Sequence, residues 1–185
     1  MLPQEKRYCL SDVLSWEEDV ELIDGVPIML ATPARVHQRI SMDLATQLNT
    51  YLAGKKCEVY AAPFAVRLFE KDGDSPYDVD TMVEPDISVI CDPAKLDDIG
   101  CKGAPDFIIE ILSPSNRRHD LLTKFNLYLR AGVREYWIVD PTSKDVQVFL
   151  LEDGHYFRKD YGTAEDTIKV NVLENCYLDL AEIFA

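Results

Sequence analysis

Long hydrophobic runs are missing from this chain of 185 residues. No apolar stretch approaches the roughly 18 to 20 residues that a membrane-spanning helix needs. Charged side chains repeatedly interrupt the N-terminal region, where a secretory signal peptide would have an apolar core. These absences predict a cytoplasmic protein with no membrane segment.

Cysteine is scarce, and its spacing carries no metal or disulfide signature. The five cysteines are odd in number, lie far apart and include no C-x-x-C pair, so they fit neither a disulfide scaffold nor a zinc site. They are Cys9, Cys57, Cys91, Cys101 and Cys176. Because free cysteine packs as a small hydrophobic side chain, we expect reduced thiols, most of them buried.

Positive charge is also in short supply. The 19 lysine and arginine residues are outnumbered by 33 aspartate and glutamate residues, which gives a formal net charge of −14. This balance disfavours nucleic-acid binding, because cations that neutralise phosphates dominate such affinity. The charge is uneven, however. Residues 70–98 are strongly acidic and predict a solvated or cation-attracting loop around residues 72–80, whereas residues 115–134 are basic and contain Arg117, Arg118, Arg130 and Arg134.

Two patterns near the N-terminus predict regular structure. Apolar alternations at residues 20–23 and 26–30 flank Asp24-Gly25, a strong signal for a β-hairpin. Thr32 and Pro33 are typical of a helix start, and the apolar residues that follow recur every four positions, which predicts an amphipathic helix of about 20 residues ending near Gly54. These apolar residues are Val36, Ile40, Leu44, Leu48 and Leu52.

The rest of the chain alternates strands with one further helix. Strands are predicted at residues 64–70, 87–91, 107–112, 135–140 and 146–151. A helix is predicted at residues 121–129, with Gly132 as its C-terminal cap. This order predicts an α/β (α+β) fold, in which residues 1–185 form a single domain with a mixed sheet flanked by helices. The helix crossover makes its two flanking strands parallel, and ligands gather at the carboxyl ends of such strands.

Glu110 interrupts an otherwise apolar strand. A buried carboxylate must be paired, hydrogen-bonded or bound to a metal; the pairing alternative here is Arg117, Arg118 or a helix N-terminus. Asp106 lies four residues away on the same strand, about 13 Å at roughly 3.3 Å per residue, too far to share one ion. Asp86 opens a different strand, and strands roughly 4.8 Å apart can bring two carboxylates together. Asp86 is therefore the better partner, and Asp106 is interpreted as a residue of a strand start.

The second helix presents one polar row. Asp120, Lys124 and Tyr128 follow each other at intervals of four residues and border its apolar stripe. The row is either part of a site at the margin of the sheet or an ordinary ion pair of Asp120 with Lys124, with Tyr128 as a core residue.

Taken together, the short blocks form one pattern that spans residues 19–149. In chain order they are Glu21-Leu22-Ile23-Asp24-Gly25, His37, Pro85-Asp86-Ile87, Glu110-Ile111-Leu112-Ser113-Pro114-Ser115, Asp120, Lys124, Tyr128, Gly132-Val133, Tyr136-Trp137 and Asp140-Pro141. This pattern resembles the Uma-two family of restriction-endonuclease-like proteins. The resemblance implies the PD-(D/E)XK nuclease fold, a mixed core sheet flanked by helices, and a phosphodiesterase site that depends on Mg²⁺ (or Mn²⁺).

The resemblance also implies a set of site residues. Asp86, Glu110 and the backbone carbonyl of Ile111 would hold the metal, since Mg²⁺ prefers oxygen ligands. The lysine that the nuclease pattern expects two residues after the glutamate is replaced by Leu112, so Lys124 would have to supply its amine from the helix. The roles of two further residues have alternative interpretations. Glu21 is either a supporting carboxylate or a solvated turn residue, and His37 is either a site residue or a histidine at the boundary of the core.

Two functions follow from these residues. The first is a metal-dependent endonuclease that hydrolyses DNA, with Arg117, Arg118, Arg130 and Arg134 as candidate phosphate contacts. The second is a non-catalytic binding or assembly module on the same fold, which the negative net charge favours. A homodimer is expected in addition, because Tyr136, Trp137 and residues 177–184 offer more apolar surface than one small sheet can cover.

Overall fold

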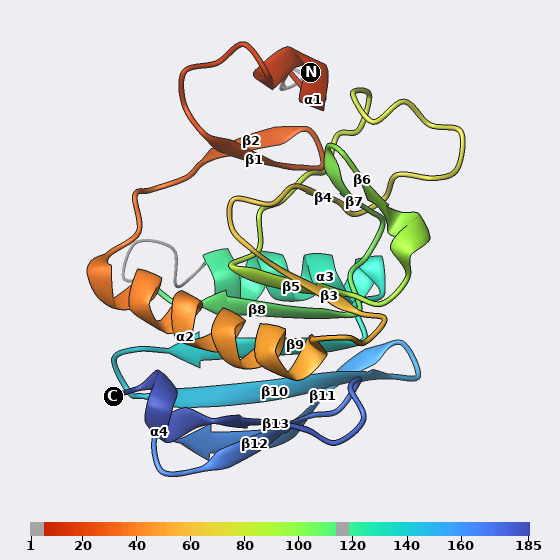
Figure 1. Ribbon diagram of the computed structural model, residues 1–185. Helices are drawn as coiled ribbons and strands as arrows, with labels where there is room; N and C mark the ends of the chain where they lie inside the picture. The colour runs from red at the N-terminus through yellow and green to blue at the C-terminus, as the bar shows by residue number, and fades with distance from the viewer. Residues whose placement is uncertain (1–5, 114–118) are drawn as a thin grey trace.

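The computed structural model describes residues 6–113 and 119–185 (Figure 1). Its centre is a six-stranded sheet in the order β11-β10-β9-β8-β5-β3. The strands, in that order, are His155–Thr163, Asp145–Glu152, Glu135–Asp140, Phe107–Ile111, Ile87–Ile90 and Glu58–Ala61. β8 and β9 pair in parallel and the other neighbours pair antiparallel, so the sheet is mixed as expected.

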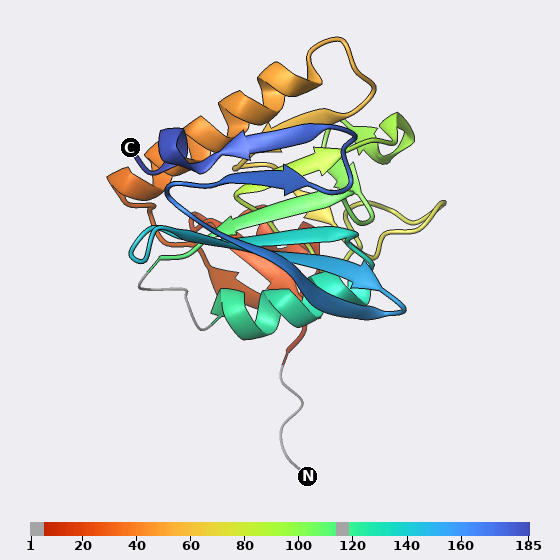
Figure 2. The same cartoon turned by 90° about the horizontal axis from the view of Figure 1, so that it is seen from below.

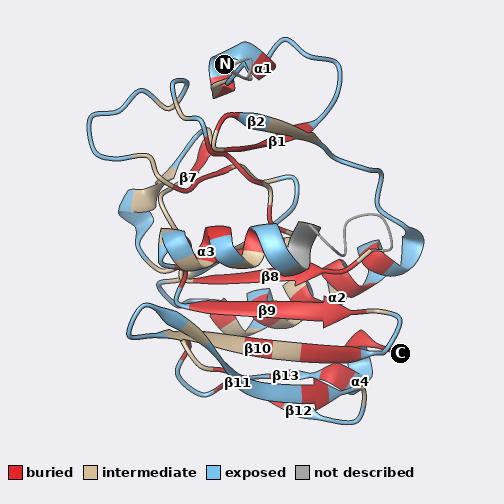
Figure 3. Ribbon diagram, turned by 180° about the vertical axis from the view of Figure 1, so that it is seen from behind, coloured by how far each residue is buried: buried red, intermediate tan, exposed pale blue. Residues whose placement is uncertain are grey.

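Two helices cover opposite faces of this sheet (Figures 1 and 3). α2 (Arg35–Leu52) packs on one face through Ile40, Leu44, Leu48 and Leu52, which are buried, whereas Val36 in its first turn is exposed. α3 (Phe125–Ala131) packs on the other face with Leu127 and Tyr128 buried, and Gly132 ends it with a φ of 84°. β8 and β9 are buried along their whole length because both of their faces are covered. The predicted βαβ unit is therefore confirmed.

The start of the first helix differs from the expectation. Thr32 and Pro33 lie outside the helix, which begins at Arg35 with Ala34 in an extended conformation at the N-cap. A residue that precedes proline is disfavoured in the helical region, which agrees with the position of Thr32 outside the helix. The helix still ends close to Gly54, at Leu52.

The N-terminal part forms a smaller layer above the core sheet (Figure 1). α1 (Leu10–Val13) precedes the predicted hairpin, whose strands are β1 (Val20–Ile23) and β2 (Val26–Met29). Asp24 and Gly25 both have positive φ, 48° and 76°, as the tight two-residue turn requires. β1 is buried throughout, and Leu22 bridges to Met82, which places the hairpin against the segment before β5.

The predicted strand at residues 64–70 is wrong in extent. Only Val66–Arg67 (β4) is extended, and it pairs in parallel with β7 (Gly100–Lys102) in a separate sheet that also contains β6 (Leu96–Asp97). The adjoining 3-10 helix is η1 (Pro93–Lys95). The edge of the core sheet is formed instead by β3, a short segment whose first and last residues are exposed and which therefore shows little apolar pattern.

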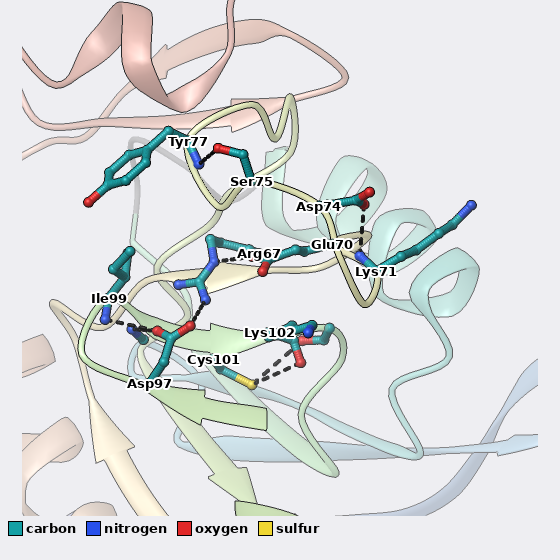
Figure 4. A network of polar contacts seen from close by, with 12 residues as sticks. Arg67, Glu70, Lys71, Asp74, Ser75, Tyr77, Asp97, Ile99, Cys101 and Lys102 are labelled. Carbon is teal, nitrogen blue, oxygen red and sulfur yellow. Dashed lines mark hydrogen bonds and ion pairs between the residues drawn. The ribbon is translucent and has the colours of Figure 1, made fainter. Parts of the chain in front are cut away.

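A buried arginine links β4 to β6 and to Glu70 (Figure 4). Arg67 is fully buried, donates from Nε to Glu70, and donates from Nη2 to Asp97 Oδ2 at 2.5 Å. Asp97 also accepts a hydrogen bond from the backbone of Ile99 at 2.8 Å. Residues 72–80 contain neither helix nor strand, which confirms the predicted loop.

The C-terminal residues add a further layer that the sequence pattern did not indicate. β12 (Thr167–Val170) pairs with β13 (Cys176–Asp179), and α4 (Leu180–Ile183) follows. Figure 2 shows β13 and α4 beside α2, on the same side of the core sheet. Leu178, Leu180, Ile183 and Phe184 are buried in the core.

This layer removes the reason given for a homodimer. Tyr136 and Trp137 are fully buried within the chain, and most apolar residues of 177–184 pack on its own core, although Tyr177 is exposed. The homodimer stays a prediction without an identified surface. Among the described residues, no helix has both the length and the apolar character to cross a bilayer.

The expectation of reduced thiols is wrong for two cysteines. Cys57 and Cys91 form a disulfide. The antiparallel register pairs Glu58 of β3 with Ile90 of β5, so the residues one step further, Cys57 and Cys91, lie directly opposite each other. The pairing was not accessible from the sequence because β3 itself was not predicted. Cys101 and Cys176 are buried free thiols as expected, and Cys9 is partly exposed.

We expect three of the five cysteines to titrate as thiols in unreduced, denatured protein. In native protein at pH 8, Cys9 should react with a thiol reagent well before the others. Burial raises the pKa of Cys101 to about 12 and that of Cys176 to about 11, so both stay protonated, and the thiolate is the reactive form. Mass spectrometry after alkylation checks both statements; five labelled cysteines in the unreduced, denatured chain would contradict the disulfide.

Candidate functional site

Side chains from separate segments converge on one buried amine. Lys124 is the last residue of a π-helical segment, η2 (His119–Lys124), which leads directly into α3. Its Nζ lies 2.9 Å from Glu21 Oε1 of β1 and 2.9 Å from Glu110 Oε1 of β8. All three side chains are at most 5% exposed. A charged group that is removed from water to this extent needs oppositely charged partners, because its desolvation costs roughly several kcal/mol that would otherwise not be offset.

Glu110 receives a second donor from the same helix. Tyr128 Oη donates to Glu110 Oε1 at 2.5 Å, one helical turn after Lys124. The predicted row along the helix therefore places Lys124 and Tyr128 on the same carboxylate. The side chain of Asp120 lies outside the described residues, and so do Arg117 and Arg118, the cations considered as partners of Glu110.

Asp86 lies at the start of β5, beside Glu110. β5 pairs with β8 through Ile87 and Ile109, so one further step places Asp86 opposite Glu110. Asp86 Oδ2 accepts a hydrogen bond from the backbone N–H of Ile111 at 2.7 Å. Asp106, the competing acid, lies near the other end of β5, where it accepts from the backbone of Cys91 at 2.7 Å. The geometric choice of Asp86 over Asp106 agrees with this arrangement.

His37 joins the site from α2. Its Nε2 lies 3.2 Å from both carboxylate oxygens of Asp86, and the side chain is buried. His37 occupies the first turn of α2, so the helix that covers one face of the sheet also holds the residue that contacts Asp86. The five predicted side chains thus form two contact groups, Glu21 with Lys124 and Glu110, and His37 with Asp86. The register of β5 with β8 places the two groups on neighbouring strands.

Glu84 belongs to the surroundings of the site and was missed from the sequence. Its backbone N–H donates to Glu21 Oε1 at 2.9 Å. Burial raises the pKa of Glu84, and the charges of Glu21 and Asp19 raise it further, while Lys124 opposes them. The available signal was its position two residues before Asp86. The segment lies beside Glu21 because it contacts the hairpin, through the Leu22–Met82 bridge and the hydrogen bond from the Gly25 N–H to the Asp80 carbonyl at 2.7 Å.

The candidate phosphate contacts that the structure describes already have carboxylate partners. Arg130 donates two hydrogen bonds to Asp24, at 2.6 and 3.1 Å, and lies over the ring of Phe69. Arg134 pairs with Asp106 at 2.7 Å. Both arginine side chains are about half exposed, at 51% and 54%. A phosphate would have to compete with these carboxylates.

The residues fit a magnesium ion by donor type. Within the described residues, no group of three or more histidine, cysteine or acidic side chains is placed to hold a metal. Mg²⁺ does not require one, since it is typically held by one or two carboxylates together with water and substrate phosphate. Asp86 and Glu110 supply two carboxylates. The N–H and C=O of one strand residue point to the same side, so the Ile111 carbonyl faces the Asp86 side, as its N–H does.

Comparison with known proteins places this geometry in context. The model of the Uma2 family, described as "Putative restriction endonuclease", matches residues 8–181. An uncharacterized protein, slr1290, from Synechocystis sp. is 26% identical over 147 residues, which are 77% of this chain and 73% of that protein. A crystal structure of a protein titled a putative nuclease of DUF820, from Anabaena variabilis, superposes with a TM-score of 0.70 at 20% identity and covers 95% of this chain and 97% of the other.

Proposed function

Because the chain belongs to the Uma2 family of restriction-endonuclease-like proteins, we propose that it is a metal-dependent endonuclease that hydrolyses phosphodiester bonds of DNA. The observation that carries the proposal is the buried Lys124 amine held against Glu110, at the strand edge where Asp86 also lies. The nuclease pattern needs an amine beside its glutamate, and Lys124 supplies one although Leu112 occupies the usual position.

The proposed metal is Mg²⁺ or Mn²⁺, held by Asp86, Glu110 and the backbone carbonyl of Ile111. A bound ion of this kind polarises the phosphate and lowers the pKa of an attacking water. Mg²⁺ and Mn²⁺ both suit carboxylate and carbonyl oxygens. The residues around the site therefore have to present these oxygens on one side and keep them in place before the ion arrives.

Each residue of the site has a separate task in this proposal. Lys124 would orient the attacking water or stabilise negative charge that develops on the phosphate oxygens. Glu21 would hold the Lys124 amine in place through its contact at 2.9 Å. His37 holds Asp86 through both carboxylate oxygens and thereby fixes its orientation. Metal ligands in proteins are commonly held in their orientation by hydrogen-bonded partners of this kind.

A second candidate, a non-catalytic binding or assembly module, is favoured by the negative net charge, which disfavours DNA affinity. The net charge is −14, and Arg130 and Arg134 are paired with Asp24 and Asp106. An assembly module needs no metal and no buried amine. Metal binding that depends on Glu110 therefore separates the two candidates.

We expect Glu110→Gln to lose Mg²⁺ and Mn²⁺ binding and all hydrolysis, since the substitution removes a charged oxygen ligand while keeping the shape of the side chain. Isothermal calorimetry measures the binding, and duplex DNA, single-stranded DNA and RNA serve as substrates. Glu152→Gln, at an exposed position of β10, is the matched control. Equal metal binding by wild type and Glu110→Gln would refute the assignment; carboxylate-dependent binding without cleavage of any substrate would favour the module.

A further inference from the structure

Tyr128 and Lys124 meet on a single oxygen atom of Glu110. Tyr128 Oη donates to Glu110 Oε1 at 2.5 Å, and Lys124 Nζ lies 2.9 Å from the same atom. A carboxylate has about four acceptor positions, two on each oxygen. The two donors from the helix therefore occupy the two acceptor positions of Oε1. It follows that a metal ion would contact Glu110 through Oε2.

The tyrosine hydroxyl is held rigidly. Tyr128 is fully buried, and its ring packs edge-on against Tyr136 with the ring centroids 5.2 Å apart. Its neighbour Leu127 is buried in the same core cluster. Because a packed aromatic ring cannot shift without opening the core, the hydroxyl fixes the position of Oε1 and with it the rotation of the carboxylate.

We propose that Tyr128 is a positioning residue that orients Glu110 so that Oε2 faces the metal on the Asp86 side. This inference rests on the proposed function, because it gives Tyr128 a task only if Glu110 holds an ion. A merely structural tyrosine would satisfy the buried carboxylate without affecting metal affinity. The distinction is measurable, since partners of metal ligands typically change affinity by about 10- to 100-fold when they are removed.

The test is Tyr128→Phe, which removes the hydroxyl and keeps the ring. Mn²⁺ affinity measured by calorimetry should fall about tenfold or more. If wild type cleaves DNA, kcat should fall as well while KM for DNA stays unchanged, since the hydroxyl does not touch the substrate. Tyr156→Phe is the control, because Tyr156 Oη donates to the backbone of Val133 at 2.8 Å and its ring packs in the same aromatic group. It should lose a comparable hydrogen bond without a change in Mn²⁺ affinity.

A measurement on the wild type covers the case in which Tyr128→Phe does not fold. The hydroxyl proton of Tyr128, held in a short buried hydrogen bond, should give a protected downfield NMR signal. The signal should persist when Mg²⁺ is added, because the ion is held by Oε2 and leaves Oε1 with the tyrosine. Loss of this hydrogen bond on saturation with Mg²⁺ would overturn the inference.

The outcomes also separate this inference from the proposed function. Wild-type Mn²⁺ affinity in Tyr128→Phe, together with lost binding in Glu110→Gln, would reject the positioning role alone. Absence of Mn²⁺ and Mg²⁺ binding by the wild type would reject both. Weakened binding in Tyr128→Phe, with unchanged binding in Tyr156→Phe, supports both.

Discussion

Lys124→Met is expected to abolish metal-dependent hydrolysis and to destabilise the metal-free protein by about 3 to 5 kcal/mol. Methionine keeps much of the length of lysine but removes the charge. Glu21 and Glu110 would then lie buried near each other without the ammonium that now contacts both at 2.9 Å. Removing one partner of a buried ion pair is costly because the other charge is left uncompensated.

The same variant should respond to metal more strongly than the wild type does. Its carboxylates remain, and no ammonium competes for them, so Mg²⁺ affinity should be at least that of the wild type. A ligand that binds only the folded state stabilises it, so added Mg²⁺ should restore part of the lost stability. Urea unfolding with and without Mg²⁺ measures this, with Lys159→Met on exposed β11 as the control. A folded Lys124→Met protein that cleaves at the wild-type rate would remove Lys124 from the mechanism.

Gly100→Ala is expected to destabilise the fold by about 4 kcal/mol through a combination of backbone strain and overlap. Gly100 has a φ of 138°, and a Cβ at this position would lie 2.1 Å from the backbone oxygen of Ala65. That oxygen is also the acceptor for the N–H of Cys101 at 2.8 Å, so it cannot move away without breaking the contact between β7 and the segment before β4.

Gly103→Ala separates the two contributions. Gly103 follows the same strand and has a φ of 76°, but a Cβ there meets nothing within 4 Å. The Gly103→Ala variant should lose only about 1 to 2 kcal/mol of folding stability, from the strain of a left-handed backbone. Chemical denaturation of the two variants gives the difference directly. Equal losses of stability would show that the overlap at Ala65 relaxes and that strain alone decides.

The central strands were predictable because both of their faces are covered. β5, β8 and β9 are mainly apolar in sequence, with few polar positions such as Glu110, and their residues are buried throughout. β11 was missed for the opposite reason: it is the other edge of the sheet, most of its residues are exposed, and its sequence is mainly polar. An edge strand is specified by the backbone of its neighbour more than by its own apolar pattern.

The residues of the candidate site also fall into two classes, those that local spacing in the sequence predicts and those that depend on long-range contacts. Strand spacing was enough to choose Asp86 over Asp106, and helical spacing was enough to align Lys124 with Tyr128. The contribution of Glu84 depends instead on long-range contacts of the hairpin with the segment before β5, such as the bridge between Leu22 and Met82, which no local periodicity connects. Likewise, the partnership of Cys57 with Cys91 depends on the register of a strand that the sequence does not reveal.

The order of the site residues along the chain has a consequence for biosynthesis. Glu21, Glu84, Asp86 and Glu110 all leave the ribosome before Lys124, the amine that contacts two of them. Until then, the emerging acidic segments repel one another, and β8 still lacks its parallel neighbour β9. The acidic centre can therefore close only late in translation. A chain released before Lys124 would carry repelling carboxylates without their counter-charge, and it would be a poor candidate for stable folding.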